Sequence, residues 1–187
     1  YRTALNVRPR WIAPADRDPD AIIVITNQLL GPAHAPTADC LNYCHVLQSR
    51  LNKRVLLINT ADMPWTLPLP YYDPIRFNYV KDYAAIGELR FKGEAFEFYQ
   101  CRKPMPNLEE IRAIVTTVRT RKPAFVLSLG HSNVAPDLCA PFVTVATMPF
   151  GTDLPRAKSN LFILPRTRRP DDANFMREWG VEENQIV

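Results

Sequence analysis

The sequence of 187 residues lacks the patterns that mark several large classes of protein. No apolar run approaches the roughly 18 residues that a membrane-spanning helix needs, and no signal peptide opens the chain. The dinucleotide fingerprint G-x-G-x-x-G and the P-loop G-x-x-x-x-G-K-[ST] are absent, as are G-x-S-x-G and H-E-x-x-H. The sequence therefore predicts no membrane span, and it excludes the usual motifs of nucleotide-binding loops, serine hydrolases and zinc peptidases.

Cysteine is scarce and carries no metal-binding pattern. The four cysteines are Cys40, Cys44, Cys101 and Cys139, and none of them forms a C-x-x-C pair or another zinc-ligand spacing. Cys40 and Cys44 stand one helical turn apart with His45 beside them, so metal binding is one interpretation. Buried structural thiols are the other, and we favour it. Free thiols are typical of a reducing compartment, which predicts a cytoplasmic protein, and we expect neither a metal nor another cofactor.

Aromatic residues are missing from the two clusters of basic residues. The clusters lie at 117–122 and 165–170, and the net charge of the chain is +4, which favours anionic partners only weakly. Nucleic-acid surfaces usually combine basic with aromatic side chains, so we expect no nucleic-acid partner. Solvated helix ends and loops are the favoured interpretation of both clusters, with a phosphate-binding patch as the alternative.

What is present is an alternation of buried strands and helices. Hydrophobic residues make up 47% of the chain, which is typical of a globular protein. Continuous apolar runs without polar alternation predict strands buried on both faces, as in a parallel sheet. We expect an α/β fold with a mostly parallel, doubly wound (Rossmann-like) sheet, helices on both faces and an inserted β-hairpin. Strands are expected at 21–26, 54–61, 124–130, 141–148 and 160–165, with a sixth beginning at 183–187.

Helices are predicted from capping residues and apolar spacing. Thr37 is expected to cap the first, and its apolar stripe is Leu41, Cys44, Leu47 and Leu51. Asn107 is expected to cap a second helix, which carries glutamates at its start and basic residues at its end. A short helix at 135–140 and a last one at 171–179, closed by Gly180, complete the set. The hairpin is expected at 87–102, around Lys92-Gly93.

The domain organisation is simple, apart from two irregular segments. Residues 1–20 are polar and broken by proline, and we expect an arm ahead of one domain at 21–187. Because the chain begins with tyrosine, we expect it to be a fragment of a longer protein. The segment 62–74 is rich in proline and aromatic residues, and the region 62–102 is expected to cover the ligand cleft, with Trp65, Tyr71 and Tyr72 facing the ligand.

Two loops place a histidine directly after a buried strand, and these loops hold the candidate site. In open parallel sheets, ligands bind at the carboxyl ends of the strands, and each loop also leads into a helix start, where free N–H groups attract anions. We expect His34 and His131 to act in catalysis, because imidazole can take a proton from a hydroxyl group near neutral pH. The candidate substrate-binding residues of the same loops are Asn27, Gln28, Thr37, Ser132 and Asn133.

Each of these residues also has a structural interpretation. Either histidine ring can bond a backbone carbonyl group and fix its loop, and Ser132 and Asn133 can cap the short helix. His45 lies beside the apolar stripe of its helix, and packing is its favoured role.

Three stretches resemble a known family. IIVITNQLLGPAHAPTADCLNYCHVLQSRLNKRVLLINTA, at 22–61, resembles the opening of the N-terminal Rossmann-like half of GT-B-type glycosyltransferases, with a histidine-bearing loop between the first strand and a helix. FVLSLGHSNVAPDLCAPFVTVATMPFG, at 125–151, is similar to a later strand of that half with its polar loop. FMREWGVEENQIV, at 175–187, resembles the passage toward the C-terminal half. No part of 62–102 carries the resemblance.

The resemblance implies a function. The chain would be the acceptor-binding half of an enzyme that moves a sugar from a nucleotide-sugar to a small-molecule or peptide acceptor. A missing C-terminal domain would hold the nucleotide-sugar, so the chain alone would be an incomplete catalyst. The family often uses a side chain near the interdomain cleft as base, which His34 and His131 match, and it usually needs no metal for catalysis.

Two further functions stay open at this point. One is a non-catalytic α/β module that binds a ligand or regulates a partner, using the same edge of the sheet without proton transfer. The other is a small hydrolase or transferase complete in itself. A hydrolase would need Ser132 as nucleophile, one of the two loop histidines as base, and Asp137 or Asp153 to orient that base.

Overall fold

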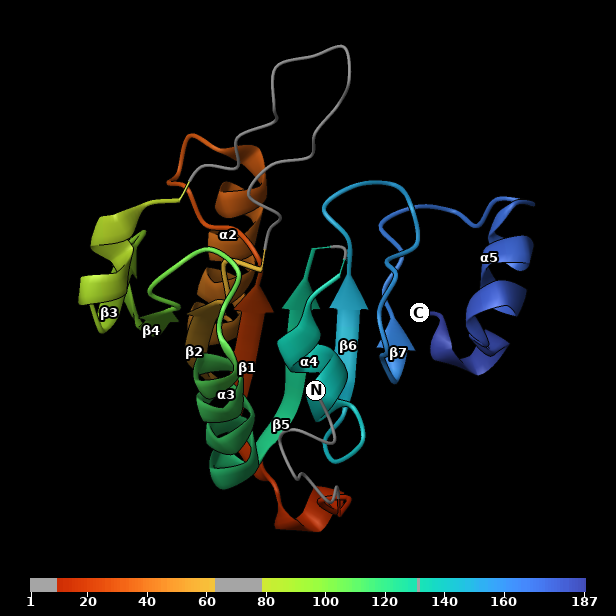
Figure 1. Cartoon of the computed structure of the whole chain (residues 1–187), viewed down its shortest axis with the longest axis horizontal. Helices are drawn as coiled ribbons and strands as arrows, with labels where there is room; N and C mark the ends of the chain where they lie inside the picture. The colour runs from red at the N-terminus through yellow and green to blue at the C-terminus, as the bar shows by residue number, and fades with distance from the viewer. Residues whose placement is uncertain (1–9, 63–78, 131) are drawn as a thin grey trace.

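The computed structural model describes residues 10–62, 79–130 and 132–187. Within them seven strands form one sheet in the order β3–β4–β2–β1–β5–β6–β7 (Figure 1). Every neighbouring pair is parallel except β3–β4, so the predicted α/β fold with a mostly parallel, Rossmann-like sheet is confirmed. The strands are β1 (Asp18–Thr26), β2 (Arg54–Asn59), β3 (Glu88–Phe91), β4 (Glu94–Gln100), β5 (Pro123–Leu129), β6 (Val145–Met148) and β7 (Leu161–Phe162).

The first three described α-helices lie between strands along the chain, and the last one follows β7. A β–α–β unit links β1 and β2 through the first long helix, and a second helix carries the chain from β4 across to β5 beside β1. The α-helices are α2 (Ala35–Ser49), α3 (Leu108–Arg121), α4 (Val134–Cys139) and α5 (Asp172–Trp179). Short 3₁₀ turns, η1 (Pro14–Asp16), η2 (Lys81–Ala85) and η3 (Glu183–Gln185), complete the described elements.

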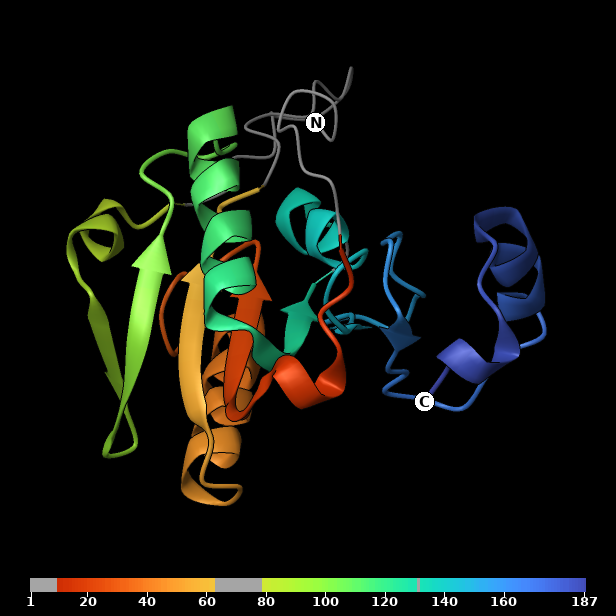
Figure 2. The same ribbon diagram turned by 90° about the horizontal axis from the view of Figure 1, so that it is seen from below.

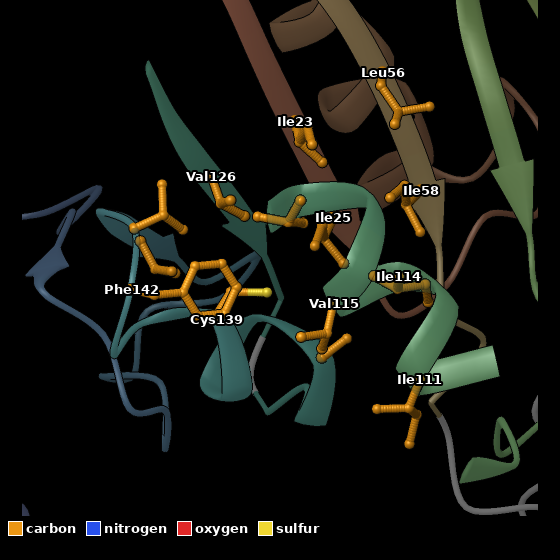
Figure 3. Close-up of a cluster of buried hydrophobic side chains, with 14 of the residues drawn as sticks. Ile23, Ile25, Leu56, Ile58, Ile111, Ile114, Val115, Val126, Cys139 and Phe142 are labelled. Carbon is orange, nitrogen blue, oxygen red and sulfur yellow. The ribbon is translucent and has the colours of Figure 1, made fainter. Parts of the chain in front are cut away.

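Strand β1 is the centre of the sheet and is buried on both faces. Its side chains alternate between two apolar clusters, as the pleat of a strand requires. Ile23 and Ile25 pack with side chains of α3 and α4, in the cluster drawn in Figure 3, while Ile22 and Val24 pack with side chains of α2. Figure 2 shows α2 and α3 on opposite sides of β1 and β2. Each fully buried isoleucine contributes about 1.5–3 kcal/mol to folding. This explains why the apolar run of β1, at 21–25, contains no polar residue before Thr26.

Strand β1 begins at Asp18, three residues before the apolar run that predicted it. The Asp18 N–H donates to the carbonyl oxygen of Lys122 at 2.8 Å, and Arg17 donates to the carbonyl oxygen of Ala124 at 3.0 Å and to Thr144 Oγ1 at 2.8 Å. These contacts attach the chain to β5 before its sequence becomes apolar. Arg17 and Asp18 are therefore attached to the domain, within the stretch 1–20 that is expected to be an arm.

The hairpin β3–β4 belongs to the main sheet. Its strands are antiparallel, and the turn residues Lys92 and Gly93 both have positive φ, 49° and 86°, as the tight hairpin turn with matching twist requires. The predicted hairpin is thereby confirmed. Because β4 pairs in parallel with β2, with Leu56 opposite Glu97, the hairpin extends the sheet at one edge.

Helix α3 follows its sequence signals closely. Asn107 caps it through a reciprocal pair of hydrogen bonds, in which the Glu110 N–H donates to Asn107 Oδ1 at 2.9 Å and the Asn107 N–H donates to Glu110 Oε2 at 3.2 Å. Its last residue is Arg121, and Lys122 follows in the left-handed conformation with φ 45°. Both ends match the prediction, because every residue that sets them is a near neighbour in sequence.

Helix α2 differs from its prediction at both ends. Its N-cap residue is His34, and Thr37 lies inside the first turn, so the prediction that Thr37 caps the helix is wrong. The helix ends at Ser49, and Asn52 turns the chain with φ 53°. Leu51 is therefore outside the apolar stripe and is 55% exposed, whereas Leu41 and Cys44 are buried as predicted.

The C-terminal third holds less strand than the sequence predicts. β6 spans only four residues and β7 only two, against eight and six expected. Instead of a further strand, 183–185 form η3, and Ile186 makes a single parallel bridge to Phe162. Side chains take the place of ladder partners here, since the Val145 N–H donates to Asn160 Oδ1 at 2.7 Å. In Figure 1, α5 stands beyond β7, at the opposite end of the sheet from the hairpin.

Candidate functional site

The centre of the sheet is a topological switch point. The chain leaves β1 on one side to form β2 and later returns to place β5 on the other side of β1. Thr26 and Leu129 stand opposite each other in the register, so the loops after β1 and β5 start at the same level of the carboxyl edge. In open α/β sheets this crevice is where ligands bind. The two loops that the sequence predicted as the site therefore start side by side.

Gly130 brings the two loops into contact. Its φ is +118°, and a Cβ atom built on it lies 2.8 Å from Asn27 Oδ1. Its N–H donates to the carbonyl oxygen of Met148 at 3.0 Å, so the glycine cannot move away from Asn27 without losing this bond. Only glycine adopts this conformation without strain and leaves room for the Asn27 side chain.

We predict that Gly130→Ala lowers the free energy of unfolding by about 1–3 kcal/mol, the usual range for a side chain forced into such a backbone conformation. Urea denaturation measures the change. Gly93→Ala separates strain from contact, because Gly93 also has positive φ but has nothing within 4 Å of the added Cβ. An effect of Gly130→Ala no larger than that of Gly93→Ala would show that the contact with Asn27 contributes nothing.

His34 is held at one ring nitrogen. It is half-buried at the start of α2, and its Nδ1 lies 2.9 Å from the Oγ1 of Thr37, which is fully buried. The same Oγ1 accepts a hydrogen bond from the Leu30 N–H at 2.9 Å. Among the described residues, Nε2 has no partner. The His34 ring is thus held by the buried hydroxyl group of Thr37, while the predicted contact of Thr37 with a ligand stays a prediction.

The start of α4 is occupied by side chains of the protein itself. The Val134 N–H donates to Asp62 Oδ2 at 2.9 Å, and the Ala135 N–H donates to Asn133 Oδ1 at 3.3 Å. The expectation that both helix starts are free for a ligand therefore fails at α4. At α2 it remains open, since no side chain caps that helix.

A buried polar network lies beneath the site. Asn133 Nδ2 donates to Thr60 Oγ1 at 2.9 Å, and Thr60 Oγ1 lies 3.2 Å from the carbonyl oxygen of Thr26. Next to it, Asn59 Nδ2 donates to Gln100 Oε1 at 2.7 Å. Fully satisfied buried networks of this kind hold loops in one arrangement. The roles of Thr60, Gln100 and Asp62 were not predicted, because nothing near these residues in the sequence marks their partners.

The remaining candidate residues have different environments. Gln28 is half-buried at the end of β1, Asn133 is buried and bonded as above, and Ser132 is exposed. His131 lies outside the described residues, as do Trp65, Tyr71 and Tyr72, so their predicted roles stay predictions.

The hydrolase alternative gains no geometric support. Within the described part of the chain, Ser132 makes no hydrogen bond to a histidine, and Asp137 Oδ1 accepts from the Lys158 N–H at 2.9 Å. Asp153 lies near the Arg166–Asp172 pair described below.

The cysteines are buried thiols, as expected. All four are free, and all are buried. Burial raises the pKa of Cys101 to about 12 and also raises that of Cys139, while the hydrogen bond between Cys40 and Cys44 is the main cause of the raised pKa of Cys40. Thiols with such raised pKa values are poor nucleophiles and poor metal ligands at neutral pH.

Two Asp-x-Asp patterns overlap at 16–20, and two of their three carboxylates are paired with basic side chains. Asp18 accepts from Arg54, and Asp20 lies 2.9 Å from Lys53 Nζ. No group of three or more His, Cys, Asp or Glu side chains suited to a metal was found among the described residues.

None of the helices in the described ranges is long and apolar enough to cross a membrane.

Carboxylates neutralise much of the two basic clusters. Arg121 donates to Glu97 Oε2 at 2.6 Å. This hydrogen bond and the positive charge of Arg121 lower the pKa of Glu97. In the second cluster Arg166 binds Asp172 through two hydrogen bonds of 2.7 Å, and Arg168 binds Glu183. The exposed Arg168–Glu183 pair agrees with the favoured interpretation as solvated loops, whereas Arg166 and Asp172 are only 12% and 8% exposed.

Beside the loop after β5 lies a cavity of about 530 Å³, which we call the Arg–Asp cavity. Its walls come from the segments that follow β5, β6 and β7 and from the first turn of α5. Its lining residues are Ser132, Asp153, Leu154, Arg156, Arg166, Arg169, Asp171, Asp172 and Phe175. The volume is within the usual range for pockets that hold small molecules.

In comparisons of the chain with protein-family models, with curated proteins and with solved structures, nothing matched. What the site can do is therefore argued from its own residues.

Proposed function

We propose that the chain is the acceptor-binding half of a glycosyltransferase, which moves a sugar from a nucleotide-sugar to an acceptor. The observation that carries this proposal is the position of His34. It stands on the loop after β1, at the switch point of a parallel sheet, with Nδ1 held by a buried hydroxyl group and Nε2 without a partner among the described residues. The resemblance of three stretches to GT-B-type enzymes supports the same function.

In the proposed reaction, His34 acts as the general base. An acceptor hydroxyl oxygen attacks the anomeric carbon of the donor sugar, and its proton goes to His34 Nε2. The bond between the anomeric carbon and the diphosphate oxygen breaks, and the nucleoside diphosphate leaves with the electron pair. A second α/β domain would hold that nucleotide, and the free N–H groups at the start of α2 would face the developing negative charge.

The base role requires one tautomer of the ring. Nδ1–H must donate to Thr37 Oγ1, so that Nε2 keeps a lone pair for the proton. A hydroxyl oxygen has two acceptor positions, so Oγ1 can accept from Nδ1–H and from the Leu30 N–H together. Thr37 thereby sets the orientation and tautomer of the His34 ring, as a buried carboxylate does in other catalytic pairs.

The proposal includes a cytoplasmic location. Four free, buried thiols support this location, since secreted proteins more often pair their cysteines in disulfide bonds.

The test measures the release of nucleoside diphosphate from a panel of nucleotide-sugars. It uses the protein encoded by the complete gene. We predict turnover with one donor and little with the others, and none by the chain of 187 residues alone. Release from no donor, with and without candidate acceptors, would contradict the proposal.

The second candidate function is a non-catalytic ligand-binding module. The Arg–Asp cavity favours it, because the cavity offers groups that bind a ligand and its described lining residues include no histidine. A ligand bound without turnover, in the protein encoded by the complete gene, would favour this function over transfer.

A further inference from the structure

The base of the Arg–Asp cavity is a satisfied ion pair. Arg166 donates to both oxygens of Asp172 at 2.7 Å and to the carbonyl oxygen of Thr167 at 2.9 Å, and the Arg169 N–H donates to Asp172 Oδ2 at 2.7 Å. The two side chains are only 12% and 8% exposed. Their charges cancel and their hydrogen-bonding groups are mostly used, so the base is a rigid, neutral surface.

The rim of the cavity carries balanced charge. Arg156 and Arg169 supply two exposed guanidinium groups, and Asp153 and Asp171 supply two exposed carboxylates. An anion would meet two carboxylates here, and a cation would meet two guanidinium groups. Because attraction and repulsion offset each other for a ligand of either sign, the rim favours a ligand that is polar but uncharged.

The rim also combines pure donors with pure acceptors. Guanidinium groups only donate hydrogen bonds, and ionised carboxylates only accept them. A hydroxyl group does both at once, so a ligand with several neighbouring hydroxyl groups can bridge Arg169 and Asp171, which are two residues apart. Ser132 adds a hydroxyl group of its own at the side toward β5.

One wall of the cavity is apolar and partly aromatic. Leu154 is buried, and Phe175 is half-buried at the wall formed by α5. Trp179 stacks on Phe175 with ring centroids 5.8 Å apart and an interplanar angle of 13°, and Arg156 lies 6.0 Å from the centre of the Trp179 ring. These contacts fix the Phe175 ring, which can then pack against the C–H groups of a ligand.

From these four features, we infer that the Arg–Asp cavity binds a saccharide: an uncharged ring with adjacent hydroxyl groups and an apolar C–H face. In the proposed glycosyltransferase this saccharide is part of the acceptor, so this role rests on the proposed function. The binding itself does not, since it needs neither donor nor turnover.

The test is a titration of the whole chain with neutral sugars. Glucose, galactose, mannose, N-acetylglucosamine and disaccharides of these are the probes, with inorganic phosphate and a nucleoside diphosphate as ionic probes. Chemical shifts of the Phe175 ring, the Trp179 indole N–H and the Ser132 amide report occupancy. We expect at least one sugar to produce saturable shifts at these groups, and the ionic probes to bind there more weakly.

Matched variants locate the binding. Arg169→Ala and Asp171→Ala each remove one exposed rim group and should weaken sugar binding about 10-fold, the effect of losing one hydrogen bond to a charged group. Arg177→Ala is the control, because Arg177 is equally exposed on α5 but bonds Asn174 and does not line the cavity. All three positions are exposed, so folding should be unaffected, which thermal unfolding verifies.

The outcomes separate the cavity from the proposed function. Sugar binding that is lost in both rim variants and kept in Arg177→Ala supports the saccharide pocket, even if no donor is ever turned over. No saturable sugar binding, or tighter binding of phosphate or the nucleoside diphosphate at the same groups, overturns it. Sugar transfer by the complete protein that is unchanged in both rim variants would leave the proposed function standing and overturn the cavity as acceptor site.

Discussion

Replacing His34 by alanine is expected to lower kcat for sugar transfer about 100-fold or more, the usual contribution of a general base. The acceptor hydroxyl group would then lose its proton to water instead of to a fixed imidazole nitrogen. KM for the donor should change little, because in the proposed mechanism His34 does not hold the nucleotide. Steady-state kinetics with the donor found in the panel, using the protein encoded by the complete gene, measures both parameters.

His45→Ala is the matched control for this experiment. His45 lies on the same helix, but its ring packs edge-on against Phe91 at 6.5 Å, and we expect its loss to leave kcat unchanged. This contact agrees with the packing role that the sequence predicted for His45. Unchanged kcat in His34→Ala, with the protein folded, would leave His34 as a loop-fixing residue.

Variants of Thr37 test whether kcat depends on the orientation of the His34 ring as well as on its presence. Thr37→Val keeps the shape but removes the oxygen that lies 2.9 Å from Nδ1, so kcat should fall by less than in His34→Ala. Thr37→Ser restores the hydroxyl group and should recover most of the rate. A merely structural role for Thr37 predicts instead that stability falls in Thr37→Val while kcat per folded molecule stays constant.

Asp172→Ala is expected to lower the free energy of unfolding by an amount on the order of 3 kcal/mol, because it leaves the Arg166 guanidinium group nearly buried without its partner. For a chain of this length, that corresponds to a fall in Tm of about 6–12 °C. Thermal and urea unfolding measure it. Glu183→Ala breaks the more exposed pair with Arg168 and should lower the free energy of unfolding much less, because water screens that pair. Equal costs for both variants would contradict the special role of the buried pair.

The Arg166–Asp172 pair also predicts how the free energy of unfolding changes with pH. Hydrogen bonds from Arg166 lower the pKa of Asp172 from 3.8 to about 2. A carboxyl group whose pKa is lower in the folded than in the unfolded state stabilises the fold above the unfolded value and loses that effect as pH falls. The difference in stability between wild type and Asp172→Ala should therefore be full at neutral pH and shrink from about pH 3.8 toward pH 2. A difference that stays constant over this range would assign the effect of the substitution to packing alone.

Features with near neighbours in sequence could be predicted from the sequence by itself. The capping box of α3 joins Asn107 to Glu110, and the hairpin turn needs only Lys92 and Gly93 to adopt positive φ. The β–α–β unit, the parallel sheet and the two loops at its carboxyl edge also followed, because a continuous apolar strand must be covered on both faces and a parallel connection returns the chain to the same edge. His34 was found in this way.

Only the tertiary structure decided what the side chains of the site do. It made Thr37 a partner of His34, and it brought Asp62 to the start of α4 across 72 positions of sequence. It also assembled the Arg–Asp cavity from segments after three strands, so that residues which look like a solvated basic cluster in sequence became a neutral ion pair under a mixed rim. Such contacts depend on the order and register of the strands. These are set by the summed burial of many distant residues, and no local pattern in the sequence specifies them.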